Sequence, residues 1–228
     1  MKGAFSVLLL CFLLASCNEE KTVKAEKPVE AEKTIQERAE AGDADAQYNM
    51  GMMYDNGDEV PQDKDEAMKW MRKAAEKGNA KAQFRLSKMY AKGQGVPQDK
   101  NEAVKWLRKA AEKGEAEAQY ILASMYVNGD GIRVPQDKDE AMKWMRKAAE
   151  KGNAKAQNSL GGRYYNGDGV PQDKAKASMF FNLAAAKGHE NGKDNSEQIK
   201  KRMTKEQIAE GQKLTREWVE RKAKEKSE

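Results

Sequence analysis

A glycine recurs along most of the chain at an almost constant interval, and this period constrains the fold more than any other feature. It falls at Gly42, Gly78, Gly114, Gly152 and Gly188, so the steps are 36, 36, 38 and 36 residues long. A period in this range is typical of solenoids, in which each unit buries its apolar surface against the next unit. The sequence therefore predicts a stack of similar units.

Each unit is predicted to contain two helices joined by a loop, as the second copy illustrates. Ala82, Leu86 and Tyr90 are spaced at i, i+4 and i+8 and form one apolar stripe on the first helix. A V-P-Q-D loop follows, whose proline prevents helix continuation and whose aspartate, Asp99, has the position of an N-cap. Trp106 belongs to the apolar stripe of the second helix. Neither helix can bury its stripe alone, so neighbouring units must stack.

The same pattern is kept in all four copies. The position after the middle stripe residue holds a small side chain that allows close helix approach, namely Gly51, Ser87, Ala123 and Gly161. The N-cap positions of the second helices hold Asp63, Asp99, Asp137 and Asp173. The aromatic residue of the second helix is Trp70, Trp106, Trp144 and finally Phe180. Two extra loop residues, Ile132 and Arg133, account for the longer step.

These motifs, A-x-A-Q-x-x-L-G-x-M-Y-x-x-G-x-G-V-P-Q-D followed by A-x-x-W-x-x-K-A-A-x-x-G, resemble the Sel-one-like repeat family, a relative of the tetratricopeptide repeats. The resemblance implies an all-α fold, a right-handed α-solenoid of about four stacked helix-turn-helix repeats with capping helices. We expect a leading helix and repeats over residues 34–188, with units at 42–77, 78–113, 114–151 and 152–187. Residues 189–228 are expected to form C-terminal capping helices and a frayed tail.

The N-terminal residues have the pattern of a secretion signal, because Lys2 is followed by an apolar run from Ala4 to Ala15. The sequence L-A-S-C resembles the bacterial lipobox, which implies cleavage of residues 1–16, acylation of Cys17 and attachment to a membrane through the acyl chains. An ordinary signal peptide with a cysteine there by chance is the alternative. By the same resemblance, Asn18 favours the outer membrane, and we expect the protein to face the periplasm, with surface display left open. Residues 17–33 would provide the lipidated cysteine and a flexible tether.

The residue inventory argues against an active site. Both cysteines, Cys11 and Cys17, lie in the N-terminal segment, and the one histidine, His189, follows a helix-ending glycine, where it has a capping or surface role. We therefore expect no catalytic, cofactor-binding or metal-binding residues. The net charge of +5 arises from 42 basic and 37 acidic residues, which are interleaved, so nucleic-acid binding is not expected. A small-molecule substrate is not expected either.

The remaining candidate for function is a binding surface. In tetratricopeptide-like stacks the first helices line the concave side, so the resemblance directs attention to first-helix positions that differ between copies. These are Asn49, Met52, Asp55, Arg85, Lys88, Ile121, Ser124, Val127, Ser159 and Tyr165. We predict a non-catalytic scaffold or adaptor of the bacterial cell envelope that binds a protein or peptide there. The alternatives are a β-lactam or peptidoglycan-related hydrolase, as in cysteine-rich relatives, and a surface-displayed binder of host proteins.

Overall fold

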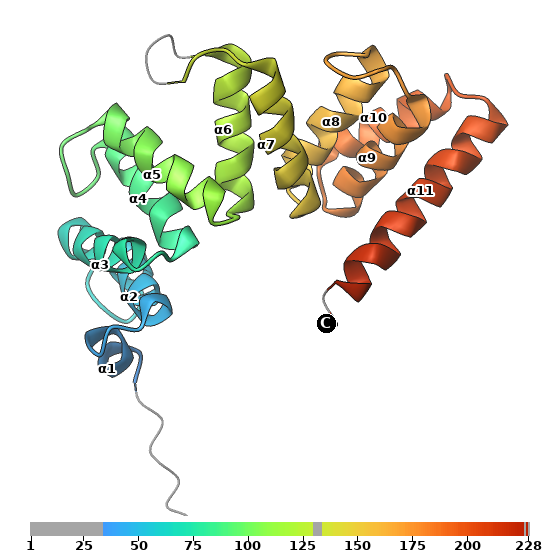
Figure 1. Ribbon diagram of the computed structural model, residues 1–228. Coiled ribbons are helices and arrows are strands. Elements are labelled where there is room, and N and C mark those ends of the chain that lie inside the picture. The colour runs from blue at the N-terminus through green and yellow to red at the C-terminus, as the bar shows by residue number, and fades with distance from the viewer. Residues whose placement is uncertain (1–33, 130–133, 226, 228) are drawn as a thin grey trace, which may run out of the picture. The chain divides into compact units, whose positions relative to one another are not determined.

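The computed structural model describes residues 34–129, 134–225 and 227. The predicted signal peptide, Cys17, the tether and the two extra loop residues lie outside the described residues. Every described residue belongs to one compact unit, Lys33–Glu228. The described part of the chain consists of helices without strands (Figure 1), which confirms the predicted all-α repeat fold.

The helices alternate regularly along the chain. Their bounds are α1 Ile35–Glu40, α2 Ala44–Asn56, α3 Lys64–Glu76, α4 Ala80–Lys92, α5 Lys100–Glu112, α6 Ala116–Asn128, α7 Lys138–Glu150, α8 Ala154–Asn166, α9 Lys174–Ala186, α10 Glu190–Lys200 and α11 Lys205–Lys224. Each repeat pairs an even-numbered first helix with the odd-numbered second helix that follows, and each second helix also packs against the next first helix.

Local capping explains why the helices begin and end where they do. Every predicted aspartate accepts backbone hydrogen bonds at the start of a second helix; Asp99, for example, accepts from the amides of Asn101 and Glu102 at 2.8 and 3.0 Å. The first helix of the second repeat ends at Gly93, whose φ of 69° lies in the left-handed region that glycine adopts without a steric penalty. These caps confirm the predicted helix-loop-helix unit.

Buried glutamines join successive repeats, a role that we did not predict. Gln83 Nε2 donates to the Ala75 carbonyl at 3.0 Å, and the equivalent bond recurs at the other repeats from Gln47 to Ala39, from Gln119 to Ala111 and from Gln157 to Ala149. Each of these carbonyls, at the end of the preceding helix, also accepts from the amide of the glycine three residues later, so the glutamine supplies its second hydrogen bond. The glutamine of the A-x-A-Q motif therefore links each repeat to the helix before it, which for the first repeat is the leading helix α1.

The predicted apolar stripes form the core. Leu86, Leu122 and Leu160 are completely buried, as are the alanines that begin each first-helix stripe. The small residue beside the stripe is required by close packing within a repeat: a Cβ added at Gly161 would lie 2.5 Å from the Phe181 ring. The helix axes can therefore approach closely at this position, as predicted.

The C-terminal segment forms two helices, α10 and α11. Gly192 lies within α10, which begins at Glu190 after His189, whose Nδ1 accepts from the Gly192 amide at 3.1 Å. Gly192 allows α10 to approach Ala184 of α9, where a Cβ would be only 2.8 Å away. The last helix, α11, continues to Lys224, and Lys222 Nζ lies 2.8 Å from a Glu150 carboxylate oxygen.

Candidate functional site

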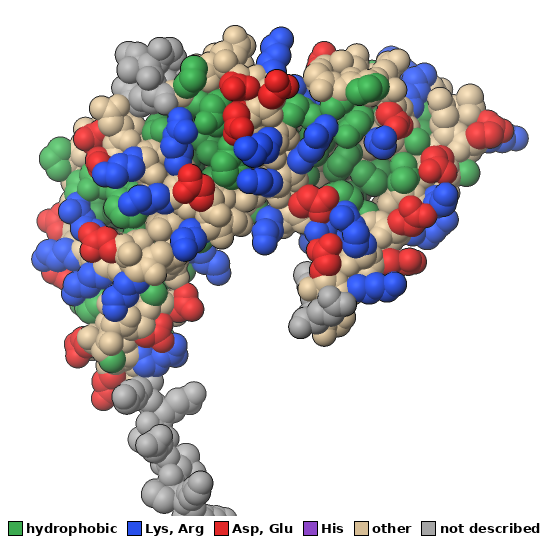
Figure 2. Space-filling view, viewed as in Figure 1, with side chains coloured by type: hydrophobic (Ala, Val, Ile, Leu, Met, Phe, Trp, Pro, Cys, Tyr) green, Lys and Arg blue, Asp and Glu red, His purple; other side chains and the backbone are tan. Residues whose placement is uncertain are grey.

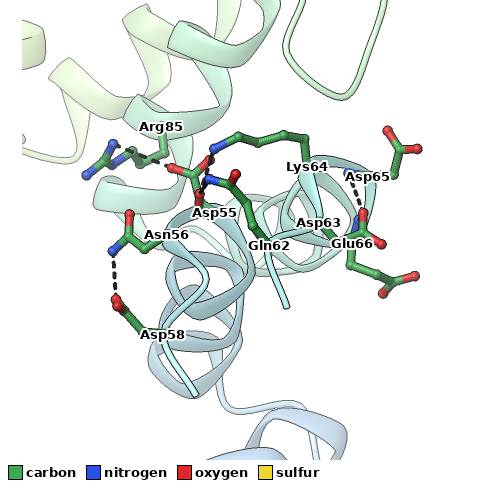
Figure 3. Close-up of polar contacts among 9 residues, drawn as sticks. All are labelled: Asp55, Asn56, Asp58, Gln62, Asp63, Lys64, Asp65, Glu66 and Arg85. Carbon is green, nitrogen blue, oxygen red and sulfur yellow. Dashed lines mark hydrogen bonds and ion pairs between the residues drawn. The ribbon is translucent and has the colours of Figure 1, made fainter. Parts of the chain in front are cut away.

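An ion-paired cluster occupies the first-helix side of the junction between the first and second repeats. Asp55, near the end of α2, accepts a hydrogen bond from Lys64 Nζ at 2.8 Å, and Lys64 also donates to the Asp55 carbonyl at 2.6 Å. From the next repeat, Arg85 Nη1 lies 4.0 Å from the other Asp55 carboxylate oxygen (Figure 3). Two of the predicted binding residues, Asp55 and Arg85, therefore pair with each other across the junction.

This pairing is modest in energy. The side chains of Lys64 and Arg85 keep 39% and 37% of their surface exposed. Exposed pairs of this kind contribute at most about 1 kcal/mol, because solvent screens the attraction. The pairing nevertheless matters for binding, since a ligand would have to compete with an existing partner for either charge.

The equivalent positions of the second junction carry different chemistry. Exactly one period later along the chain, Ala91 replaces Asp55 and Ile121 replaces Arg85, while Lys100 takes the place of Lys64. Without the ion pair, the junction opens into a pocket of about 400 Å³ between α4, α5 and α6. Its apolar wall is formed by Phe84 and Ala91 of α4, Val104 and Leu107 of α5, and Ile121 and Met125 of α6.

Two lysines also line this pocket. Lys88 Nζ lies 5.6 Å from the centre of the Phe84 ring, a cation–π contact, and makes no ion pair within the described part of the chain. The Lys100 side chain makes no hydrogen bond or ion pair to any described residue, in contrast to Lys64 one repeat earlier. None of the residues that line the pocket is acidic. The pocket thus combines apolar walls with two ammonium groups that have no carboxylate partner there.

The other predicted binding residues are distributed along the stack. Met52 and Val127 pack partly against apolar clusters, and the Ser124 hydroxyl donates to the Tyr120 carbonyl at 3.0 Å. The Tyr165 hydroxyl accepts from Arg202 Nη1 at 2.6 Å, so the residues between α10 and α11 already contact it. Asn49 is exposed beside a polar hollow that lies over the ends of the first helices, and Ser159 is half-buried.

The structure therefore brings together only two of the ten predicted residues in a concave site, Lys88 and Ile121. Lys100, Val104 and Leu107 were missed because they lie on a second helix, whereas the prediction considered first helices alone. A comparison between copies would have found Val104, since the equivalent residues are Met68, Met142 and Ser178. Phe84 and Met125 are first-helix residues that were overlooked.

The shifted pKa values of three lysines in the described part of the chain share one surface arrangement. The raised pKa values of Lys69, Lys105 and Lys143 have the same main cause, a hydrogen bond to the glutamate three residues earlier on an exposed helix surface. None of these lysines lines the pocket. Within the described ranges, no group of three or more His, Cys, Asp or Glu side chains could hold a metal ion.

Charged side chains of both signs alternate over the face of the molecule shown in Figure 2, with hydrophobic side chains visible between them. Among the described helices, the first helix of the second repeat carries the largest excess of basic over acidic residues. Its sequence, AKAQFRLSKMYAK, contains four basic residues and no acidic residue. The pocket is therefore lined in part by a strongly basic helix.

Comparison with known proteins identifies the repeats. The family model described as Sel1 repeat matches four consecutive segments, residues 44–79, 80–115, 116–153 and 154–189, which together make up more than half of the chain. These segments begin two residues after the units expected from the glycine period. The chain has no match among the curated proteins.

Two solved structures resemble the chain over most of its length. One is a Sel1 repeat protein from Oxalobacter formigenes, which is 38% identical with a TM-score of 0.68 over 72% of this chain and 47% of that chain. The other is a protective antigen present in uropathogenic Escherichia coli strains that displays an SLR fold; it is 30% identical with a TM-score of 0.57 over 82% of this chain and 47% of that chain. This chain thus spans about half the length of each relative.

Proposed function

Because the chain belongs to the Sel1 repeat family, we propose that it is a non-catalytic adaptor that binds a protein or peptide segment on its first-helix side. Repeats of this family generally mediate protein–protein interactions. The pocket between the second and third repeats is the anchoring site in this proposal. Its occupant would contact Lys88 and Ile121, two residues that differ from their counterparts in the other copies.

The single observation that supports this function best is the change of chemistry between the first and second junctions. A solenoid that only had to be stable could use the same contacts at every junction, because the repeats stack in the same way. Here an ion pair is replaced by an apolar pocket of about 400 Å³, within the range of about 300–1,000 Å³ that is usual for ligand sites. An exposed apolar concavity beside basic side chains favours recognition of a partner.

The proposal places the adaptor in the cell envelope as a lipid-anchored protein facing the periplasm. This part rests on the sequence of residues 1–18, in which an apolar run precedes Cys17. Among the residues that the structure describes, no helix is long and apolar enough to cross a bilayer. In cells, Cys17→Ala should release the repeats from the membrane or block signal cleavage. Membrane retention of a processed Cys17→Ala protein would contradict the anchor.

Photo-crosslinking in cells tests the adaptor function. A photoreactive residue replaces Lys88 in one strain and Lys143 in a control strain; Lys143 is an exposed residue of α7, the helix after α6, and does not line the pocket. Mass spectrometry then identifies the adducts. A dominant protein adduct from position 88, reduced by Ile121→Arg and absent from position 143, is the expected result. Equal adducts from both positions, or adducts from position 143 alone, would refute binding at this site.

A further inference from the structure

We infer that the pocket between the second and third repeats accepts an acidic partner segment, with one bulky apolar side chain inserted into the pocket and carboxylates placed against Lys88 and Lys100. This inference rests on the proposed adaptor function and adds the chemistry of the partner. It follows from three independent features of the pocket: the apolar wall, the two lysines and the neighbouring helix charge.

The apolar wall sets the first requirement. Side chains from three helices, including Phe84, Leu107 and Ile121, surround the pocket, and all of them are present before any partner binds. Filling such a preformed concavity with an apolar side chain removes both apolar surfaces from water, which favours binding. A polar side chain would gain little there and would lose its own hydration. The inserted group should therefore be a leucine, methionine or phenylalanine.

The two lysines set the second requirement. The first junction shows how this backbone geometry treats a lysine at the position of Lys100: Lys64 bonds to the carboxylate of Asp55 at 2.8 Å. In the second junction Ala91 supplies no carboxylate, so Lys100 lacks the partner that its counterpart has. A carboxylate of the partner can take the place that Asp55 fills one repeat earlier.

The charge of α4 gives the third requirement. Lys81, Lys88 and Lys92 make no ion pair with a described residue, and Arg85 is the only basic residue of this helix that faces a carboxylate within the described ranges, at 4.0 Å. A basic segment would be repelled on approach, whereas an acidic one would be attracted and oriented before docking. Charge complementarity therefore selects an acidic segment over a neutral or basic one.

A display selection tests the inference with a defined probe, a library of random twelve-residue peptides presented to the purified chain kept soluble in a mild detergent. The counter-target is the double variant Ala91→Asp, Ile121→Arg. This variant copies the residues of the first junction into the second, so it should fold with an ion pair in place of the pocket. Circular dichroism and thermal unfolding establish that the helices are retained.

The expected result is enrichment, on the wild-type chain alone, of peptides in which Asp or Glu surrounds one Leu, Met or Phe. A selected peptide should bind about tenfold or more weakly when its apolar residue is changed to Ser, or when Lys100→Glu is introduced in the protein. Lys138→Glu is the matched control, because Lys138 has the same place in the third repeat but does not line the pocket. It should change the affinity by less than about twofold.

Other outcomes would overturn the inference. Enrichment of basic or uncharged peptides, or of the same peptides on the double variant, would show that the pocket does not select this chemistry. If the double variant unfolds, the comparison of Lys100→Glu with Lys138→Glu still tests the inference, because equal effects of the two substitutions on peptide affinity would refute a role for Lys100. Binding to phosphatidylglycerol vesicles that depends on Lys100, without peptide enrichment, would instead assign the lysines to a lipid surface.

The two proposals can fail separately. A partner crosslinked from position 88 through a segment without acidic residues would leave the adaptor standing and refute the acidic segment. Enriched acidic peptides without any crosslinked protein in cells would support the pocket chemistry and refute the adaptor. A third outcome concerns residues 18–33 of the same chain. If a selected peptide binds more tightly after these residues are removed, the chain supplies its own occupant of the pocket, and a separate partner segment is refuted.

Discussion

The indole of Trp218 on α11 meets the ring of Phe180 on α9 edge to face, with centroids 5.7 Å apart and ring planes inclined by 72°. In the first three repeats the equivalent aromatic is a tryptophan, and a lysine three residues later lies over its ring at 4.1 or 4.2 Å. The fourth repeat has Leu183 at the lysine position. The last helix thus supplies an aromatic contact to the ring whose counterparts contact a lysine in the other repeats.

Trp218→Ala should therefore destabilise the C-terminal end of the stack by about 1–3 kcal/mol, less than a fully buried tryptophan because Trp218 is only half-buried. Urea unfolding followed by circular dichroism measures the change. The neighbouring Val219 is 54% exposed, so Val219→Ala serves as a control and should change stability by less than about 0.5 kcal/mol. Equal effects of the two substitutions would contradict this role of α11.

Two adjacent glycines of α8 should respond in opposite directions to alanine. A Cβ at Gly161 would lie 2.5 Å from Phe181, so Gly161→Ala should cost about 1–3 kcal/mol through overpacking. A Cβ at Gly162 meets nothing within 4 Å, and Gly162→Ala should stabilise the helix by about 0.5–1 kcal/mol. Thermal unfolding of the two variants measures the sign of each change in stability. Destabilisation by Gly162→Ala would show that the helix packing is not as described.

Stability at acid pH should depend on Asp43, the N-cap of α2. The hydrogen bond from Arg38, at 2.6 Å, and that from the Ala46 amide hold the pKa of Asp43 below its ordinary value of 3.8. Because the folded state lowers this pKa, the stabilisation is present above the ordinary value and is lost as the pH falls through the lowered one.

Asp43→Asn provides the comparison, because asparagine keeps the cap, as Asn79 and Asn153 do at the equivalent positions, but has no charge. We expect wild type to be the more stable near neutral pH, with the difference shrinking as the pH falls through the acid range below 3.8. Hydrogen exchange of the α1 and α2 amides at several pH values measures this. A difference that stays constant with pH would exclude the ion pair as its source.

The end of α11 should depend on Glu150 of α7. Lys222 Nζ lies 2.8 Å from one Glu150 oxygen, and Arg221 Nη2 lies 3.3 Å from the other. Glu150→Gln should speed hydrogen exchange in the last turns of α11 while reducing global stability by no more than about 1 kcal/mol, since the groups are partly exposed. Glu220→Gln, one residue before Arg221, is the control. Unchanged exchange in Glu150→Gln would show that α11 is held without these ion pairs.

The repeat architecture could be predicted from the sequence because its determinants act over short distances. The i, i+4 stripes, the N-cap aspartates and the glycines that end the helices each involve residues within about one helical turn, so the pattern around Asp99 and Gly114 identifies the unit. Stacking then follows, since the stripes have no other surface on which to be buried. The prediction that His189 caps a helix is confirmed, and this cap too joins residues close in sequence, because His189 Nδ1 accepts from the Gly192 amide.

The sequence alone therefore determined the period, the helices and the positions that vary between copies, but it did not determine which of these positions are available to a partner. That depended on contacts between residues far apart in the chain: Asp55 meets Arg85, Tyr165 accepts from Arg202, and Glu150 receives Arg221 from 71 residues away. Such contacts arise only when separate helices are placed side by side. The tertiary structure decided that Lys88 and Ile121 share a pocket and that a second-helix residue, Lys100, belongs with them.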